Sequence, residues 1–229
     1  MGFRDQEDYR VRFDWGPKAV EHLAPLSATV VVVDVLRFTT AVDAAVAKGA
    51  RVRPLRWSER GERAATDDYL SPALIAGKVV AGEVVELPSP NGAELSLRAA
   101  EAGATVFAAC LRNASAVARA AGAASGALTV IACGERWEDE TSLRPCVEDL
   151  LGAGAVLAAL DLAEASPEAR LAAAAFRGAR DQLAGLIRDC ATARELLEKG
   201  QGRDLPWAAG HDASPAAPLL REGLYEAAR

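Results

Sequence analysis

Residues 30–50 read VVVVDVLRFTTAVDAAVAKGA, and they carry the clearest indication of the architecture. Four consecutive valines predict a strand that is buried on both faces, as in a parallel sheet covered by helices. Asp34 follows at the carboxyl end of this strand, and good helix formers then run to Lys48 before Gly49 ends the helix. Ligands of open α/β sheets bind where such a strand passes into such a helix, so a site is expected here.

Three further segments repeat this order of strand, polar crossing and helix. The four crossings are residues 34–40, 88–92, 110–113 and 134–144. Such alternation predicts βα units on a mostly parallel sheet. Because βα connections are right-handed, all four crossings should emerge at one edge of the sheet. We therefore expect a single α/β domain over residues 1–229.

The same patterns predict the segments that lie between these units. Residues 9–15 alternate and predict a half-buried strand at an edge of the sheet. Residues 57–65 predict a charged, exposed helix, and residues 66–72 predict a polar loop. Residues 78–86 predict one bent strand or two short strands, and residues 134–143 predict a long polar loop.

The last part of the chain, residues 166–229, predicts a helical cover on the sheet rather than a second domain. Residues 166–168, SPE, are a strong helix start, and alanine-rich segments predict three short helices that end at Gly200. The tail beyond them is irregular and adds an edge strand near Leu224 and Tyr225. Because alanine-rich helices need covering, we also expect a homo-oligomer.

The composition is ordinary for a globular protein, with 51% hydrophobic and 25% charged residues and a net charge of -6. It shows no basic stripe, so nucleic acid is not an expected partner. No apolar stretch reaches membrane-spanning length, and the N-terminus lacks the apolar segment of a secretory signal. We therefore expect a cytoplasmic protein with reduced thiols. The widely spaced cysteines are Cys110, Cys133, Cys146 and Cys190.

The four crossings bring together three kinds of polar side chain. The carboxylates are Asp34, Glu135, Glu138, Asp139 and Glu140, with Glu148 and Asp149 in the next helix. The arginines are Arg37, Arg112, Arg136 and Arg144, and the neutral groups are Thr39, Thr40, Asn91, Asn113, Ser115 and Ser142. Carboxylates favour a hard cation such as Mg²⁺, whereas arginines and helix N-termini bind phosphate, sulfonate or carboxylate. This combination indicates phosphoryl chemistry.

Some of these residues also have ordinary structural interpretations. Residues 138–140 read as a solvated acidic run, and Asn91 and Asn113 suit turn and helix-cap positions. Asp34 is different, because a carboxylate directly after four valines is costly to bury unless it is paired or bound to metal.

Other site classes find no support in the sequence. His22 and His211 lack motif partners, so neither a histidine-based triad nor a zinc site is expected. There is no Walker-A loop and no dinucleotide fingerprint. The DxD motif of haloacid-dehalogenase-type phosphatases fails at Leu36.

Four ordered blocks resemble the motifs of the 2-phosphosulfolactate phosphatase family. Residues 34–40, DVLRFTT, resemble its DVLRATT motif, and residues 88–95, PSPNGAEL, are similar to its TNGT segment. Residues 109–118, ACLRNASAVA, resemble its FLNASAVA segment. Residues 134–157, GERWEDETSLRPCVEDLLGAGAVL, are similar to its SLEDLLCAGA block. The resemblance covers about residues 28–160.

This resemblance implies a three-layer α/β/α fold and a magnesium-dependent phosphatase. The reaction of the family releases phosphate from 2-phospho-3-sulfolactate and gives 3-sulfolactate, on a route to coenzyme M. The sequence departs from the family at residues 67–72, DDYLSP, which keep only the end of a GFDLGNSP segment. Ser89 and Pro90 also replace the threonine-rich part of TNGT. The fold and the phosphatase chemistry therefore carry over better than the substrate does.

The residues and the resemblance lead together to a hypothesis for the site. Asp34 binds Mg²⁺, with the rest of the metal shell from Glu135, Glu148 or Asp149. The residues that hold the phosphoryl group are Arg37, Thr39 and Thr40. The residues expected to contact the substrate are Asn91, Gly92, Arg112, Asn113, Ser115, Arg136 and Arg144. The nucleophile is either Asp34 or a water molecule activated by the metal.

Two alternatives stay open at this point. One is a phosphatase of the same mechanism that acts on another small phosphorylated acid, which the altered residues 67–72 favour. The other is a non-catalytic anion-binding protein of the same fold, against which Asp34, Arg37 and the Glu148-Asp149 pair argue.

Overall fold

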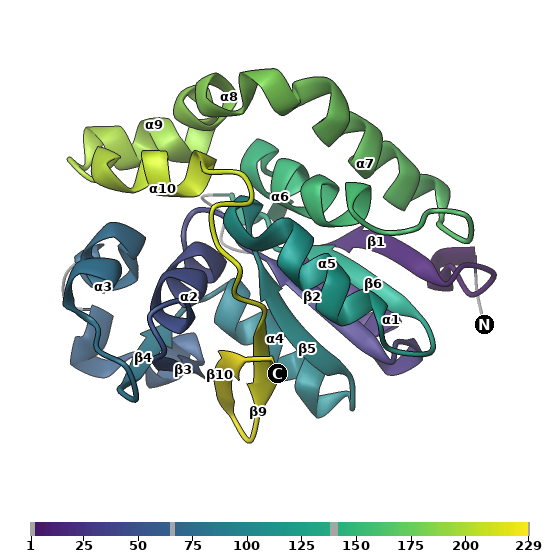
Figure 1. Ribbon diagram of the computed structural model, residues 1–229, viewed down its shortest axis with the longest axis horizontal. Coiled ribbons are helices and arrows are strands. Elements are labelled where there is room, and N and C mark those ends of the chain that lie inside the picture. The colour runs from purple at the N-terminus through teal and green to yellow at the C-terminus, as the bar shows by residue number, and fades with distance from the viewer. Residues whose placement is uncertain (1–2, 65–66, 138–141, 229) are drawn as a thin grey trace.

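The computed structural model describes residues 3–64, 67–137 and 142–228, and it has a mixed eight-stranded sheet with helices on both faces (Figure 1). The strand order is β1-β6-β2-β5-β9-β10-β3-β4. The strands are β1 (Val11–Trp15), β2 (Thr29–Val33), β3 (Arg51–Leu55), β4 (Val84–Pro88), β5 (Thr105–Ala109), β6 (Leu128–Ala132), β9 (Pro218–Arg221) and β10 (Leu224–Ala227). β1 lies at one edge of the sheet, as predicted.

The valines of β2 face two separate cores. Val30 and Val32 belong to a core with the helices of one face, and Val31 and Val33 belong to the core of the other face. All four side chains are fully buried. Successive side chains of a strand point to opposite faces, so an unbroken apolar run requires a cover on both sides. The predicted three-layer α/β/α fold is confirmed.

The helices divide between the two faces accordingly. The first core contains residues of α1 (Gly16–Leu23), α2 (Phe38–Val46), α3 (Pro72–Lys78) and α4 (Gly92–Glu101). The second core contains residues of α5 (Ala114–Gly122), α6 (Val147–Ala158), α7 (Pro167–Ala179), α8 (Leu183–Asp189), α9 (Ala191–Glu198) and α10 (Leu205–Ala209). In the part of the chain that the structure describes, no helix is both long and apolar enough to span a membrane.

The C-terminal strands occupy an unexpected place in the sheet. The edge strand predicted near Leu224 is wrong, because β9 and β10 form a hairpin between β5 and β3 (Figure 1). β9 pairs antiparallel with β5, and β10 pairs antiparallel with β3. The hairpin thereby joins the parallel strands β1, β6, β2 and β5 to the parallel pair β3 and β4. Tyr225 is fully buried there. Pairing between strands so far apart in the chain leaves no mark on local periodicity.

The region between β3 and β4 also differs from its prediction. The helix predicted at residues 57–65 is replaced by two 3₁₀ turns, Trp57–Glu59 and Gly61–Ala64, and Gly61 has a φ of 50°. Lys78 ends α3 instead of beginning a strand, and only β4 is extended. The Ser71 side chain accepts a hydrogen bond at the start of α3, which explains why a helix forms here.

The loop predicted at residues 134–143 contains a short hairpin. Its strands are β7 (Glu135–Arg136) and β8 (Leu143–Arg144). Glu138, Asp139 and Glu140, read from the sequence as an acidic run, lie outside the described residues.

Candidate functional site

Asp34 lies in the loop between β2 and α2, and its carboxylate joins the starts of two helices. Oδ1 accepts a hydrogen bond from the backbone N–H of Phe38 at 3.1 Å, in the first turn of α2. Oδ2 accepts one from the backbone N–H of Gly92 at 2.9 Å, in the first turn of α4, and faces the Ser89 hydroxyl at 3.5 Å. The N-termini of helices favour negative charge, so both helices stabilise a carboxylate at this point.

Burial works in the opposite direction on the same group. Asp34 is only 7% exposed. Burial raises the pKa of Asp34 to about 7, and the negative charge of Glu135 adds to this rise, while the N–H groups of Phe38 and Gly92 oppose it. Asp34 is therefore poised to gain or lose a proton near neutral pH.

Asp149, in the first turn of α6, is a second buried carboxylate that holds two loops together. Its Oδ1 accepts a hydrogen bond from the backbone N–H of Val35, and its Oδ2 accepts one from the backbone N–H of Gly134, both at 2.8 Å. Burial raises the pKa of Asp149, and the nearby charges of Asp34 and Glu148 raise it further. Glu148 is 2% exposed in the same helical turn.

Glu135 brings the loop after β6 against the loop after β4. Its Oε2 accepts a hydrogen bond from Nδ2 of Asn91 at 2.9 Å. Burial raises the pKa of Glu135, whereas the contacts with Asn91 and the charge of Arg144 lower it. Arg144 is held from the other side, because its Nη2 donates to Oγ1 of Thr192 at 3.1 Å.

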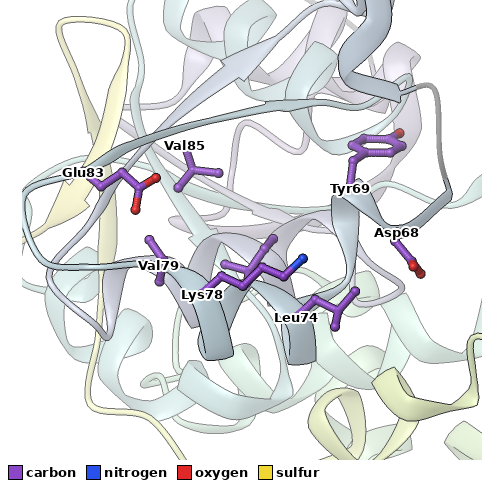
Figure 2. A pocket seen from close by; sticks show the side chains of 8 residues that line it. Asp68, Tyr69, Leu74, Lys78, Val79, Glu83 and Val85 are labelled. Carbon is purple, nitrogen blue, oxygen red and sulfur yellow. The ribbon is translucent and has the colours of Figure 1, made fainter.

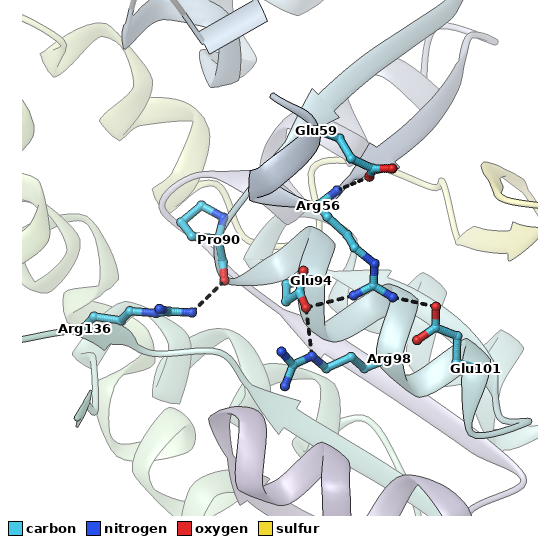
Figure 3. Close-up of polar contacts among 7 residues, drawn as sticks. All are labelled: Arg56, Glu59, Pro90, Glu94, Arg98, Glu101 and Arg136. Carbon is cyan, nitrogen blue, oxygen red and sulfur yellow. Dashed lines mark hydrogen bonds and ion pairs between the residues drawn. The ribbon is translucent and has the colours of Figure 1, made fainter. Parts of the chain in front are cut away.

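Arg136 lies at the exposed rim of this group, where its Nη2 reaches the backbone carbonyl of Pro90 at 3.5 Å (Figure 3). Ion pairs nearby brace α4. Glu94 accepts from Arg56 and from Arg98, each at 2.8 Å, as Figure 3 shows. These contacts support the helix whose first turn binds Asp34.

The two predicted threonines shape the loop from within. Oγ1 of Thr39 donates to the carbonyl of Asp34 at 2.7 Å and accepts from its N–H at 3.0 Å. Oγ1 of Thr40 donates to the carbonyl of Val35 at 2.7 Å. Both threonines are fully buried, so they hold the backbone of the loop in place.

Arg37 lies in the same loop and is fixed by a residue that the sequence did not reveal. Its Nη1 forms an ion pair with Oδ2 of Asp204 at 3.2 Å. The Arg37 side chain keeps 10% of its surface exposed, and Asp204 is fully buried. Asp204 stands in a segment without motif or periodicity, so no signal in the sequence pointed to it.

Three predicted substrate residues make their contacts elsewhere. Arg112 forms an ion pair through Nε with Asp43 at 2.9 Å, and its guanidinium stacks 4.3 Å from the ring centroid of Trp207. Oδ1 of Asn113, a fully buried residue, accepts from the N–H of Cys110. The Ser115 hydroxyl donates to Asp212 at 2.7 Å. These contacts tie Arg112 to α2 and α10, Asn113 to the end of β5, and Ser115 to the C-terminal segment, rather than to Asp34.

The site is therefore built from the loops after β2, β4 and β6. The predicted residues that the structure joins through contacts or charge effects are Asp34, Asn91, Gly92, Glu135, Arg144, Glu148 and Asp149. As the side chains stand, the described residues contain no group of three acidic, histidine or cysteine side chains that could by itself hold a metal ion.

A separate pocket of about 390 Å³ lies between α3 and β4 (Figure 2). It is lined by Asp68, Tyr69, Leu74, Ile75, Lys78, Val79, Glu83 and Val85. None of these residues belongs to the predicted site.

Comparison with known proteins gives a consistent assignment. A model of the family described as "2-phosphosulpholactate phosphatase" matches residues 53–223, which is more than half of the chain. A protein of Thermus thermophilus named "Probable 2-phosphosulfolactate phosphatase" is 32% identical over 241 aligned residues. This alignment covers 95% of the chain and 97% of the relative, so the loop after β2 falls within it. The chain belongs to the 2-phosphosulfolactate phosphatase family, and it is a phosphoric monoester hydrolase.

Proposed function

We propose that this protein hydrolyses 2-phospho-3-sulfolactate to 3-sulfolactate and phosphate, with Mg²⁺ as its cofactor. The observation that carries the proposal is a group of carboxylates in loops that also carry arginines, at the carboxyl edge of the sheet. The carboxylates are the buried Asp34, Glu148 and Asp149 and the half-buried Glu135, and the arginines of the same loops are Arg37, Arg136 and Arg144. The name of the Thermus relative supports the choice of substrate.

The charges of these carboxylates favour a cation. The charge of Glu135 raises the pKa of Asp34, and the charges of Asp34 and Glu148 raise that of Asp149. Mg²⁺ in proteins is usually held by one or two carboxylates, with water and substrate phosphate completing the shell, so a full cage of protein ligands is not required. Asp34 and one of Glu135, Glu148 or Asp149 would hold it. When bound, Mg²⁺ neutralises negative charge on the phosphoryl oxygens.

The substrate carries a phosphate, a sulfonate and a carboxylate, and all three attract arginine. Arg37 is nearest in sequence to Asp34 and would bind the phosphoryl group. Arg144 and the exposed Arg136 would contact the other two anionic groups. Asn91, which already donates to Glu135, orients that carboxylate at the mouth of the site.

Two roles for Asp34 are compatible with its position. As a nucleophile, its oxygen would form a bond to phosphorus while the ester P–O bond breaks, and water would then release phosphate. As a general base, it would take a proton from the attacking water. Acid quench during turnover of ³²P-labelled substrate separates the two, because only the first route binds the labelled phosphoryl group covalently to Asp34.

The test of the proposed function is phosphate release from racemic phosphosulfolactate, with phospholactate and phosphoglycerate in parallel. Each substrate is assayed with Mg²⁺ and with EDTA. We expect rapid, Mg²⁺-dependent release from the sulfonate substrate. Faster turnover of another substrate would contradict the substrate assignment, and equal turnover with EDTA would contradict the role of the metal.

Substitution of Asp34 tests the site itself. We expect Asp34→Asn to lower kcat/KM by roughly 10³-fold or more, as for other residues that contact the reacting atoms. The control is Asp14→Asn, which removes a half-buried carboxylate of the edge strand β1 that accepts a hydrogen bond from the backbone N–H of Trp15 at 2.8 Å. Retention of full activity by Asp34→Asn would exclude Asp34 from the reaction.

The location of the protein, the route that its product enters and its oligomeric state remain predictions. We expect a cytoplasmic protein whose product enters a route to coenzyme M, and a homo-oligomer that covers part of the exposed apolar surface. Leu171 of α7 and Leu197 of α9 are 71% and 47% exposed, which supports self-association. Light scattering on the purified protein measures the number of subunits.

A further inference from the structure

A fully buried carboxylate of the C-terminal cover, Asp204, reaches the predicted site from outside the sheet. Asp204 ends the 3₁₀ turn Gly202–Asp204 and immediately precedes α10. Its Oδ2 forms the ion pair with Nη1 of Arg37, and the Arg37 side chain is itself only 10% exposed. The two residues are 167 positions apart in the chain.

The other oxygen of the same carboxylate is also occupied. Oδ1 of Asp204 accepts a hydrogen bond from the Ser71 hydroxyl at 2.5 Å, and the backbone N–H of Ala73 lies at 3.4 Å. Ser71 is fully buried and precedes Pro72 at the start of α3. One carboxylate therefore joins the loop after β2, the beginning of α3 and the C-terminal cover.

The segment that carries Asp204 is anchored on both of its sides. Trp207 of α10 stacks on the Arg112 guanidinium, and Asp212 accepts hydrogen bonds from the backbone N–H and the hydroxyl of Ser115. The N–H of Ser214 donates to the carbonyl of Arg112 at 2.8 Å. These contacts bind residues 204–214 to the loop after β5, so Asp204 is presented to Arg37 from a fixed position.

A buried ion pair is poor evidence for a purely stabilising role, because apolar residues of the same size often stabilise a core as well or better. Arg37 also lies in the same loop as Asp34, three residues further along the chain. Its ion pair with the buried Asp204 restricts the positions that the guanidinium can take, so an anion that arrives at this loop meets a guanidinium whose place is already set.

We propose that Asp204 is a positioning residue, which holds Arg37 for the phosphoryl group of the substrate, so that the C-terminal cover completes the anion site of the sheet loops. Asp204 thereby acts on the substrate only through Arg37, a role that rests on the function proposed for this protein. Ser71 serves the same arrangement, because its hydroxyl donates to Asp204 and fixes the carboxylate from the side of α3.

The experiment is a double-mutant cycle on the full-length protein with Asp204→Asn, Arg37→Met and their combination. The dissociation constant of inorganic phosphate is measured by calorimetry, and KM and kcat are measured with phosphosulfolactate. We expect Asp204→Asn to weaken phosphate binding by roughly tenfold or more, the effect typical of residues that orient a ligand-binding group. In the Arg37→Met background we expect Asp204→Asn to change the dissociation constant of phosphate by less than about twofold, because the effects of two residues that act through one contact are not additive.

Two further variants separate positioning from stability. Arg12→Met removes a buried guanidinium of the edge strand β1 that donates hydrogen bonds to backbone carbonyls of Tyr9 and Leu26, so it should lower the melting temperature without changing phosphate affinity. Ser71→Ala leaves no buried charge unpaired and should weaken phosphate binding several-fold. It therefore provides the test if Asp204→Asn does not fold.

The outcomes distinguish this role from the proposed function. Unchanged phosphate affinity in Asp204→Asn or in a folded Ser71→Ala, or additive losses in the cycle, overturns the role of Asp204 whatever the substrate. The phosphate affinities of the variants can follow the expected cycle while the wild-type protein hydrolyses none of the three esters. That result overturns the proposed function and supports the role of Asp204.

Discussion

Asp34 receives N–H groups from two helices and yet keeps a high pKa, because burial removes the water that would solvate its charge. Helix N-termini favour the ionised form, whereas burial and the charge of Glu135 favour the protonated form. The balance leaves the pKa of Asp34 at about 7. Without a bound cation, the folded protein therefore holds a proton that the unfolded chain, with an aspartate pKa of about 3.9, has already released.

This difference predicts how stability depends on pH. Between about pH 4 and 7 the folded state binds more protons than the unfolded state, so the free energy of unfolding falls as the pH rises. One such group contributes a slope of at most about 1.4 kcal/mol per pH unit. Urea denaturation at pH 5 and pH 7.5, in EDTA, should show greater stability at pH 5. The difference should shrink in Asp34→Asn, and an unchanged difference would contradict the raised pKa of Asp34.

Gly92 is required by the close approach of α4 to Asp34. A Cβ at this position would lie 2.7 Å from Oδ2 of Asp34 and 2.9 Å from Cγ of Phe38. We expect Gly92→Ala to destabilise the protein by about 1–3 kcal/mol, as overpacking does. Displacement of the Asp34 carboxylate should also lower kcat/KM by roughly 10²-fold.

A glycine with open space around it supplies the control for this prediction. Gly77 of α3 has no atom within 4 Å of its would-be Cβ, so Gly77→Ala should leave stability and activity unchanged or slightly raise stability. Equal kinetics in Gly92→Ala and in the wild type would show that the contact between α4 and Asp34 is dispensable.

At the scale of elements, α6 carries Glu148 and Asp149 and lies between the sheet and α7. Two glycines make this close packing possible. A Cβ on Gly152 would lie 2.6 Å from Cγ2 of Val35, and a Cβ on Gly154 would lie 2.8 Å from Cβ of Phe176. The helix that positions two buried carboxylates is therefore fitted tightly on both sides.

We expect Gly154→Ala to lower the free energy of unfolding by about 1–3 kcal/mol, because α7 must move away from α6. Gly178→Ala on α7 is the matched control, since nothing lies within 4 Å of its would-be Cβ. Denaturation curves of the two variants measure the difference. Equal stability of the two variants would mean that α7 can move away from α6 without lowering the free energy of unfolding.

At the scale of the whole molecule, the β9–β10 hairpin connects two groups of parallel strands. It pairs with each group over a short stretch: Leu219 pairs with Phe107 of β5, and Tyr225 pairs with Val52 of β3. The buried side chain of Tyr225 adds to this limited strand pairing, because it packs edge-on against Phe38 and donates a hydrogen bond to Ser96 at 2.7 Å. The hairpin therefore supports the residue whose N–H binds Asp34.

Deletion of residues 216–229 should abolish cooperative unfolding, because it exposes the edges of β5 and β3 and removes the packing against Phe38. Circular dichroism melts and gel filtration measure the loss of cooperativity and the expected aggregation. Tyr225→Phe provides a graded comparison, since it keeps the ring and should cost about 1 kcal/mol for one hydrogen bond. A truncated chain that melts cooperatively as a monomer would contradict the bridging role of the hairpin.

The sequence by itself determined the βα units, the burial of β2 on both faces and the loop edge where Asp34 meets Glu135 and Asp149. These features follow from local signals, because an apolar run, a cap or a glycine stop acts within a few residues, and parallel strands bring their loops to the same edge. The family motifs lie on these same loops. The sequence misassigned residues 57–65 and 78–86, where the choice between turn, helix and strand depended on weak local preferences.

Only the tertiary structure decided the place of the C-terminal hairpin, the partners of Arg112 and Ser115, and the contact of Asp204 with Arg37. Each of these depends on contacts between residues that are 69 to 173 positions apart, from Arg112 with Asp43 to Tyr225 with Val52. Such contacts are selected by the packing of the whole chain, because a buried charge takes whichever partner the fold brings to it. No periodicity or spacing within a single segment records that choice.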